Sequence, residues 1–164
     1  MSMEKISIRK VEAIDAEFLF NLMNNESILK SLNEVTTSLD TWERAITEWN
    51  NDSDEEEHII FDNNIPIGWL GVNHLTHQDK LAFIKIIAVL PDKQGLGIGP
   101  YVINHLIENL KFRGYKSIAL YTDRSNVNAQ KCYQKCGFVI TDTMVRKMSN
   151  GKYVERYKME VGLK

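Results

Sequence analysis

The chain has 164 residues, of which 43% are hydrophobic and 26% are charged, as is typical of a globular protein. A single domain over residues 1–164 is the simplest organisation for this length. The longest aliphatic run, Ile86–Leu90, is far shorter than the ~18 residues of a membrane helix, and the first residues contain no apolar stretch typical of a secretory signal. We therefore expect a cytoplasmic protein with no membrane partner.

The net charge of −2 conceals a strongly uneven distribution. Residues 1–79 contain 5 basic and 16 acidic side chains, whereas residues 80–164 contain 15 basic and 6 acidic ones, so the two parts carry −11 and +9. This asymmetry indicates either that each part meets a charged partner or that surface helices carry solvated charge. The negative total argues against a nucleic-acid partner.

The first strand is predicted where Ile6 and Ile8 alternate toward Val11. A helix follows over Ile14–Met23, and a second helical segment lies near Ser27–Leu32. The apolar face expected for the first helix consists of Ile14, Phe18, Leu19 and Leu22.

A third helix is capped by either Ser38 or Asp40. Its apolar residues at helical spacing are Trp42, Ala45, Ile46 and Trp49. Five acids between Asp52 and Glu57 then predict a solvated loop.

The middle of the chain is predicted to form strands joined by tight turns. They are His58–Phe61, the turn Asp62–Asn64, the strand Ile65–Leu75, the turn His77–Asp79 and the most apolar strand, Leu81–Leu90.

The C-terminal part alternates helices and strands before a final hairpin. Its expected elements are a helix over Gly97–Phe112, a strand over Ser117–Tyr121, a helix over Asn126–Cys136 ended by Gly137, and hairpin arms over Phe138–Val145 and Tyr153–Val161. The dipeptide Asn150-Gly151 predicts a type I′ turn between the arms. The mixed order argues for one α/β domain with a largely antiparallel sheet.

Two cysteines, Cys132 and Cys136, lie four residues apart on one predicted helix. They could touch the same metal, but no histidine or second cysteine pair lies nearby in the sequence to complete a site. We therefore predict no metal, and two buried helix residues in a reduced, cytosolic protein.

The most informative segment is the glycine-rich turn between the apolar strand and the long helix. Gly95, Gly97 and Gly99 would let main-chain N–H groups converge on an anion, and the start of a helix adds partial positive charge. We therefore expect the loop to bind phosphate. It lacks the Gly-Lys-Ser/Thr end of a Walker loop, and Pro100 or Val102 stands where a dinucleotide loop needs its third glycine.

Two motifs together resemble the GNAT superfamily of acyl-CoA-dependent N-acyltransferases. The first is Gln94-x-x-Gly97-x-Gly99, and the second is Asn126-x-x-Ala129-x-x-x-Tyr133-x-x-x-Gly137-Phe138. The expected strand order matches over nearly the whole chain. The resemblance implies a mixed, mostly antiparallel sheet that splays between two central parallel strands and is flanked by helices. It also implies transfer of an acetyl group to a primary amine by direct attack in a ternary complex.

The same resemblance implies the site residues. Acetyl-CoA, the acetyl donor, is expected between the two splayed strands, with the N–H near Val89 holding the thioester oxygen. Tyr133 is the expected catalytic residue, as the acid that protonates the departing thiolate, and Asn126 is expected to bond the pantetheine. Pro100 removes one donor that relatives could offer the phosphate. The expected coenzyme A-binding set is Ile87, Ala88, Val89, Gln94, Gly95, Leu96, Gly97, Ile98, Gly99, Pro100 and Asn126.

The acceptor is predicted to be a cationic amine, because Glu26, Glu34 and Asp40 lie in the early region that contacts substrate in this fold. Trp42 or Trp49 could line the pocket, although their spacing also suits the core. No carboxylate stands at the positions where relatives often carry a general base. Asp123, His74 or a chain of waters remain as alternatives, and we favour the waters.

Three functional alternatives stay open at this level. The chain could acetylate a small or peptide amine, it could modify aminoglycosides, or it could be a non-catalytic acyl-CoA sensor. The presence of Tyr133 argues against the sensor. The final hairpin has an edge strand through which the chain could form a homodimer.

Overall fold

The computed structural model describes residues 3–164 and contains one seven-stranded sheet in the order β1-β2-β3-β4-β5-β7-β6. Met1 and Ser2, which belong to the segment read as lacking a secretory signal, lie outside the described residues. The strands are β1 (Ile6–Lys10), β2 (Glu56–Asp62), β3 (Ile65–Asn73), β4 (Leu81–Val89), β5 (Ser117–Asp123), β6 (Val139–Lys147) and β7 (Tyr153–Gly162).

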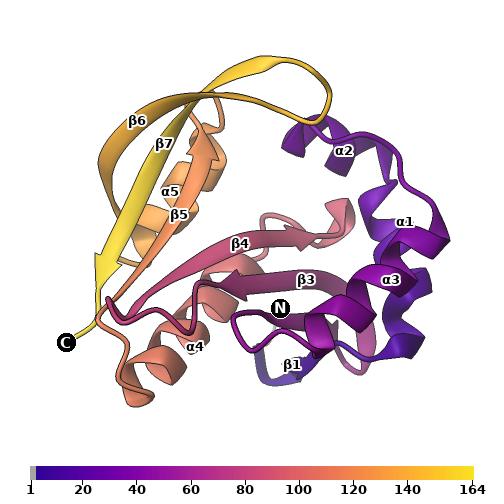
Figure 1. Cartoon of the computed structure of the whole chain (residues 1–164), viewed down its shortest axis with the longest axis horizontal. Coiled ribbons are helices and arrows are strands. Elements are labelled where there is room, and N and C mark those ends of the chain that lie inside the picture. The colour runs from indigo at the N-terminus through magenta and orange to yellow at the C-terminus, as the bar shows by residue number, and fades with distance from the viewer. Residues whose placement is uncertain (1–2) are drawn as a thin grey trace.

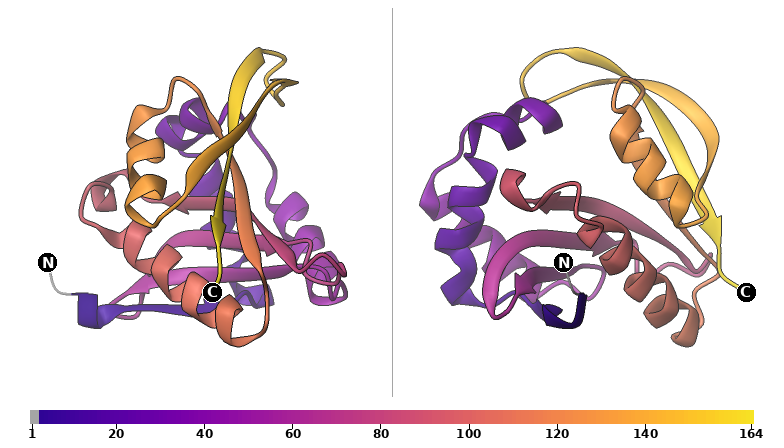
Figure 2. Two further views of the ribbon diagram at one scale, coloured as in Figure 1. Left: turned by 90° about the vertical axis from the view of Figure 1, so that its left-hand side faces the viewer. Right: turned by 180° about the vertical axis from the view of Figure 1, so that it is seen from behind.

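Helices cover both faces of the sheet (Figures 1 and 2). The α-helices are α1 (Ala16–Met23), α2 (Glu26–Leu32), α3 (Leu39–Asn50), α4 (Ile98–Phe112) and α5 (Val127–Lys135). Short 3-10 turns occupy Met3–Lys5, Ala13–Asp15 and Pro91–Lys93. No helix among residues 3–164 is long and apolar enough to cross a membrane.

Two hydrophobic cores lie on opposite faces of the sheet. Ile60 packs in the core that includes residues of α4, whereas its neighbour Ile59 packs in the core that includes residues of α1 and α3. Successive side chains of a strand point to opposite faces, so β2 serves both cores. The apolar run of β4 has the same explanation, since Val89 joins the first core and its neighbour Ala88 joins the second.

The central parallel pair separates along its length. Strands β4 and β5 pair only between Leu81–Phe83 and Ser117–Ala119, whereas every other neighbouring pair is antiparallel. Beyond Phe83 the two strands diverge, as Figure 1 shows. The predicted fold class, a mostly antiparallel sheet splayed between two parallel strands, is therefore confirmed.

Ile14 was predicted to be buried, and this is wrong, because the side chain is 81% exposed. The segment Ala13–Asp15 forms a separate 3-10 turn before α1 begins. Asp15 is buried there and accepts hydrogen bonds from Arg9 Nη2 at 2.8 Å and Glu12 N at 2.7 Å. This inward-facing carboxylate fixes the turn and leaves Ile14 directed to solvent.

The solvated acidic loop was predicted to extend to Glu57, but it ends two residues earlier in the structure. Glu56 and Glu57 belong to β2, and Glu57 is only 2% exposed. The structure keeps Glu57 inside because Trp69 Nε1 donates a hydrogen bond to its Oε1 at 2.8 Å. Charge density alone could not reveal that partner, since Trp69 lies on the next strand.

The type I′ turn occurs at a different hairpin from the predicted one. Asn63 and Asn64, between β2 and β3, both have positive φ, at 50° and 67°, as a type I′ turn requires. At the tip of the final hairpin only Gly151 has positive φ, and its N–H bonds the carbonyl of Met148 at 2.9 Å. This tip is therefore a longer turn with a left-handed glycine.

Helix α5 packs against the start of α4. A Cβ placed on Gly99 would lie 3.4 Å from Cys132 Sγ, which puts the start of α4 within van der Waals contact of α5. Cys136 is buried as predicted, whereas Cys132 is half-buried, and both are free thiols. The second motif is thereby brought beside the glycine loop.

Candidate active site

The glycine loop presents unpaired main-chain donors at the start of α4. Gly95 and Gly97 have positive φ, at 75° and 85°, which is a conformation that glycine adopts without strain. Gly97 is the N-cap and supplies no side-chain bond, so the N–H groups of Ile98 and Gly99 have no acceptor within the helix. Pro100 has no N–H to offer. This geometry suits an anion such as a phosphate.

The exposed edge of β4 presents a second set of main-chain groups. Leu90 N donates to Ile67 O of β3 at 2.8 Å. Because main-chain directions alternate along an antiparallel strand, Ala88 also faces β3, whereas Ile87 and Val89 face the gap toward β5. Of the three β4 residues predicted to contact coenzyme A, two therefore direct their N–H groups into the gap.

Gln94 joins the loop to the strand. Its Nε2 donates a hydrogen bond to the carbonyl of Val89 at 2.9 Å. This bond occupies one of the gap-facing carbonyls and holds the glycine loop at the end of β4. The predicted loop residue is thus placed as a tether, while Leu96 is 44% exposed at the tip.

The second motif lies on α5. Asn126 caps this helix through its Oδ1, which accepts from Ala129 N at 3.1 Å. Tyr133 packs its ring 6.1 Å from that of Phe138, and burial raises the pKa of its phenol. The phenol therefore stays protonated at neutral pH and can act as a proton donor.

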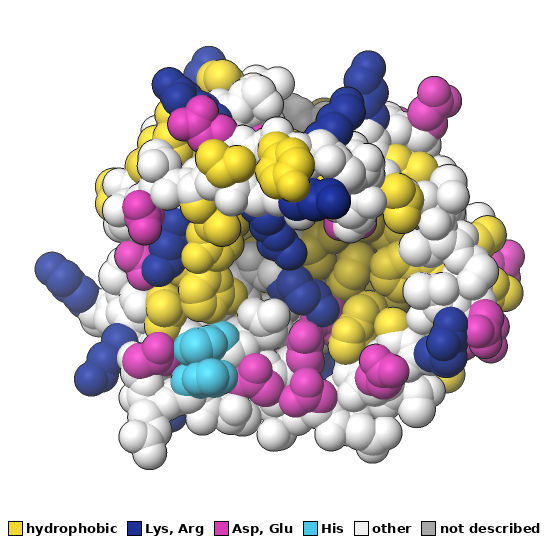
Figure 3. Space-filling model, turned by 45° about the horizontal axis from the view of Figure 1, so that its top comes forward, with side chains coloured by type: hydrophobic (Ala, Val, Ile, Leu, Met, Phe, Trp, Pro, Cys, Tyr) yellow, Lys and Arg dark blue, Asp and Glu magenta, His cyan; other side chains and the backbone are white. Residues whose placement is uncertain are grey.

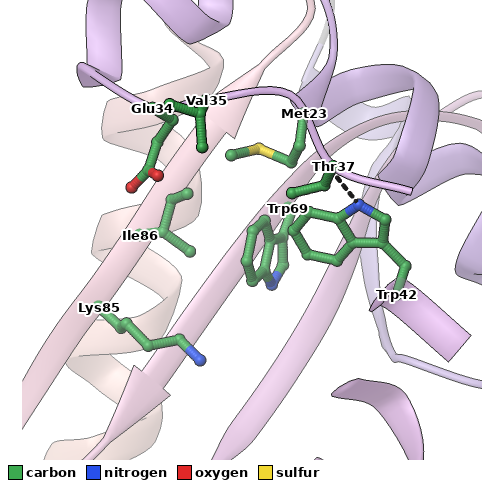
Figure 4. Close-up of a pocket in the computed structure, with 8 residues that line it drawn as sticks. All are labelled: Met23, Glu34, Val35, Thr37, Trp42, Trp69, Lys85 and Ile86. Atoms are coloured by element: carbon green, nitrogen blue, oxygen red, sulfur yellow. Dashed lines mark hydrogen bonds between the residues drawn. The ribbon is translucent and has the colours of Figure 1, made fainter. Parts of the chain in front are cut away.

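A cavity of about 250 Å³, which we call the tryptophan pocket, opens beside β4. Figure 4 shows the side chains that converge on it from α1, α3, the α2–α3 loop, β3 and β4. They are Met23, Glu34, Val35, Thr37, Trp42, Trp69, Lys85 and Ile86. Figure 3 shows that this face of the molecule is hollowed, with an apolar floor and charged side chains around it.

The two tryptophans that line this pocket, Trp42 and Trp69, form an aromatic cluster with Trp49. The ring centres of Trp42 and Trp69 are 5.5 Å apart, and those of Trp49 and Trp69 are 5.4 Å apart. Trp42 Nε1 donates to Thr37 Oγ1 at 2.8 Å, which orients the indole. Trp42 was predicted either to belong to the core or to line the pocket. It does both, because the ring is buried and also forms part of the pocket wall.

Only one of three acidic candidates lines this pocket. Glu34 is half-buried and faces the cavity. Asp40 is 73% exposed and pairs with Arg44 at 3.0 Å on the surface of α3, and Glu26 is exposed at the start of α2.

Sequence reasoning missed the charged group at the back of the pocket. Lys85 Nζ lies 3.1 Å from Glu55 Oε2 and 3.2 Å from Glu57 Oε2. Lys85 occupies a β-bulge, since β3 pairs with Ile84 and Ile86 and skips the residue between them. One sequence feature could have revealed it, because Lys85 is the only charged residue in the run Leu81–Leu90.

Neither candidate for the general base is free. Asp123 accepts from Asn33 Nδ2 at 2.9 Å and from Arg156 Nε at 3.2 Å. His74 stacks on His77, with ring centres 3.5 Å apart, and bonds Asp79 at 3.2 Å. The ring centre of His74 also lies 5.5 Å from that of Phe83, the last residue of β4 that pairs with β5.

These features define a class of protein. A splayed parallel pair with a main-chain edge, a glycine loop at a helix start and a tyrosine on the following helix form the acyl-CoA-binding framework expected from the two motifs. Comparison with known proteins agrees. The model of the Acetyltransferase (GNAT) family matches residues 22–138.

Individual relatives extend the match to nearly the whole chain. A spermidine N(1)-acetyltransferase of Vibrio cholerae is 26% identical over 162 residues, which cover 96% of this chain and 92% of the relative. An uncharacterized N-acetyltransferase of Methanocaldococcus jannaschii is 32% identical over 102 residues, which cover 59% of this chain and 45% of the relative. A crystal structure of the Vibrio cholerae spermidine N-acetyltransferase with CoA and spermine has a TM-score of 0.87 at 24% identity, covering 97% and 96% of the two chains.

The chain therefore belongs to the GNAT family and is an acetyl-CoA-dependent N-acetyltransferase.

Proposed function

We propose that this enzyme transfers an acetyl group from acetyl-CoA to a primary amine of a small polycation, with a polyamine such as spermidine as the acceptor. The observation that carries the proposal is the tryptophan pocket, where Glu34 faces a cavity walled by Trp42 and Trp69 beside the free edge of β4. A carboxylate and aromatic faces are the groups that attract an ammonium ion. The name of the Vibrio cholerae relative supports the same substrate class.

The main-chain groups around the gap fit the donor. Coenzyme A supplies a thioester, from which an acetyl group can pass to a neutral amine. The N–H groups of Ile98 and Gly99 would hold its pyrophosphate, where Gly95 leaves open space on its Cβ side. Ile87 and Val89 would bond the pantetheine arm as an added strand, and Val89 N–H would stabilise charge on the carbonyl oxygen.

The acceptor must lose a proton before it attacks. An amine with a pKa near 10.4 is neutral in about one molecule in 2,500 at pH 7, which corresponds to roughly 4.6 kcal/mol. Since Asp123 and His74 are held by partners of their own, we favour removal of this proton through water. Attack is then direct, in a complex that holds both substrates.

Tyr133 is the proposed acid. Its phenol is protonated at neutral pH because burial raises its pKa, and a thiolate is a suitable acceptor for its proton. Asn126 already uses Oδ1 to cap α5, so its amide nitrogen is the group we assign to the pantetheine.

A panel of amines tests the proposal. Purified enzyme is mixed with acetyl-CoA and, separately, spermidine, spermine, a lysine peptide, an aminoglycoside or no amine, while free thiol is measured and the amine product is weighed by mass spectrometry. Preferred turnover with the polyamines supports the proposal. Preferred turnover with the aminoglycoside would contradict the polyamine as acceptor and support an aminoglycoside-modifying enzyme. Tight coenzyme A binding without turnover of any amine would indicate a non-catalytic acyl-CoA sensor.

Two further expectations accompany this function. Strand β6 is an edge of the sheet and leaves Val139 and Val145 61% and 67% exposed, so we propose that the chain self-associates there, at least as a homodimer. One structure of the Vibrio cholerae relative is described as dodecameric. The free thiols of Cys132 and Cys136 are consistent with the reducing cytoplasm that the sequence favours.

A further inference from the structure

The back of the tryptophan pocket is already built as a cation site. Lys85 Nζ lies 4.8 Å from the ring centre of Trp49 and 5.8 Å from that of Trp69. Two carboxyl groups, those of Glu55 and Glu57, complete its surroundings at 3.1 and 3.2 Å. We call these four residues, Glu55, Glu57, Trp49 and Trp69, the cation box. Aromatic faces within about 6 Å and carboxylates are the groups that bind an ammonium ion.

The cation box is enclosed by protein. The side chain of Glu57 is 1% exposed, that of Glu55 is 17% exposed and that of Lys85 is 29% exposed. Glu57 Oε2 accepts no hydrogen bond within the described chain, and its ion pair with Lys85 is its polar contact. A carboxyl oxygen so buried depends on a cation in the cation box, or on remaining protonated.

The cation box already holds a positively charged side chain. Burial raises the pKa of Glu57 to about 9, with Glu55 also raising it and Lys85 opposing it. Lys85 Nζ lies 3.1 Å from the carboxyl group of Glu55 and 3.2 Å from that of Glu57. Its ammonium group therefore occupies the place where a second ammonium ion would have to bind.

We propose that Lys85 is a specificity-determining residue, whose ammonium group fills the cation box and so prevents a second ammonium of the acceptor from binding there. Glu34 then remains as the carboxylate of the pocket that receives a substrate cation. The pocket consequently binds an acceptor molecule that has one ammonium group near Glu34. It has no strong preference for an acceptor whose second ammonium group would reach the cation box. This inference rests on the proposed function, since it refines how that pocket selects amines.

The bulge in β4 supports this assignment. In a regularly paired strand, the side chain of the residue between Ile84 and Ile86 would follow the alternation of its neighbours. A bulge changes the direction of one side chain, which here is that of Lys85. Gly71 faces the same place, because a Cβ there would collide with the Glu57 carboxylate and would lie 3.1 Å from Lys85 Cε. Two local features thus make room for Lys85 at this position.

The test compares Lys85→Met with Lys85→Arg. Each is titrated with linear diamines from 1,3-diaminopropane to 1,8-diaminooctane and with the monoamine of equal chain length. All three tryptophans of the chain, Trp42, Trp49 and Trp69, lie in this cluster, so intrinsic fluorescence reports binding without any need for turnover. Lys85→Met should raise the diamine-to-monoamine affinity ratio about tenfold for the lengths that reach the cation box, whereas Lys85→Arg should keep the wild-type ratio.

An unchanged ratio in Lys85→Met at every chain length, or an equal rise in Lys85→Arg, would overturn the inference. Lys85→Gln provides a second neutral variant if Lys85→Met does not fold. The outcomes also separate the inference from the proposed function. If the wild type acetylates no amine, the proposed function fails, but the fluorescence ratio still decides whether Lys85 blocks a cation site.

Discussion

The two regions beside the free edge of β4, the proposed coenzyme A site and the tryptophan pocket, are built from different kinds of groups. On the proposed donor side, most of the groups are main-chain N–H groups, those of Ile87 and Val89 at the gap and those of Ile98 and Gly99 at the start of α4. On the proposed acceptor side, the tryptophan pocket is built from side chains that come from two helices, a loop and two strands. One side therefore depends on backbone conformation, and the other depends on the identity of each side chain.

This difference sets how each side responds to substitution. A main-chain site tolerates changes of side chain but fails when the backbone is forced into another conformation. A side-chain pocket keeps its shape when one residue is changed, and its affinity changes by the contribution of that residue. The donor side should therefore show all-or-none effects and the acceptor side graded ones.

The largest effect is expected from Gly97→Val. Gly97 has φ of 85°, where an L-residue costs about 1–2 kcal/mol and a β-branched one is least tolerated. The loop should shift and the affinity for coenzyme A should fall at least a hundredfold, measured by calorimetry. Gly114→Val is the matched control, because Gly114 has φ of 91° and lies at the far end of α4. Retained coenzyme A binding in Gly97→Val would contradict the loop assignment.

Tyr133→Phe should be next in size. Removal of the phenol takes away the proposed proton donor, and general acid catalysis contributes roughly 10²–10⁴-fold. We expect kcat to fall by a factor near the lower end of that range, with little change in coenzyme A affinity. Steady-state rates and equilibrium binding measure the two quantities separately. Equal turnover by the variant would remove Tyr133 from the mechanism.

A smaller effect should follow from Glu34→Gln. The carboxylate faces the tryptophan pocket and is half-buried, and a charge-assisted contact of this kind corresponds to about a five- to tenfold change in affinity. KM for a polyamine should rise by that factor while kcat changes less. Asp40→Asn should leave KM unchanged, since Asp40 is 73% exposed and paired with Arg44. A similar effect from both variants would mean that only overall charge matters.

The smallest effect concerns stability rather than activity. The pKa of Glu57 is raised to about 9 in the folded protein, mainly by burial, so the folded state binds more protons than the unfolded state between pH 4.5 and that value. Stability from this group is therefore complete below its unfolded pKa and is lost as the pH rises through the folded one.

Thermal melts of Glu57→Gln should show this directly. The variant should gain Tm over wild type steadily as the pH rises from about 5 to about 8. Each pH unit between the unfolded and folded pKa values of Glu57 removes up to about 1.4 kcal/mol of wild-type stability, and ~1 kcal/mol shifts Tm by roughly 2–4 °C in a chain of this size. Glu48→Gln, at an exposed position of α3, should follow the wild type. A constant difference across that range would show that Glu57 is ionised in the fold.

The donor side could be predicted from the sequence because its information is local. Glycine spacing predicted a turn that leads into a helix, where Gly95 and Gly97 have positive φ, and the apolar run predicted β4. Most element boundaries agree for the same reason. The type I′ turn failed at Asn150-Gly151 because the loop length, set by the pairing of β6 with β7, selects the turn type.

The acceptor side could not be predicted because its contacts join distant segments. Glu57 looked like part of a solvated acidic run until Trp69 and Lys85, from two other strands, gave it partners. Asp123 was one of the alternatives for the general base, and its bonds to Asn33 and Arg156 come from segments far away in the sequence. Register and burial decide such roles, and neither is encoded within a short window of sequence.

Amide hydrogen exchange along β4, measured residue by residue by NMR with and without coenzyme A, tests the central claim most directly. The N–H groups of Ile87 and Val89 face the gap, whereas those of Ala88 and Leu90 face β3. The account predicts an alternating result, in which coenzyme A slows exchange at Ile87 and Val89 and leaves Ala88 and Leu90 nearly unchanged. Uniform protection along the strand, or none at Ile87 and Val89, would contradict it.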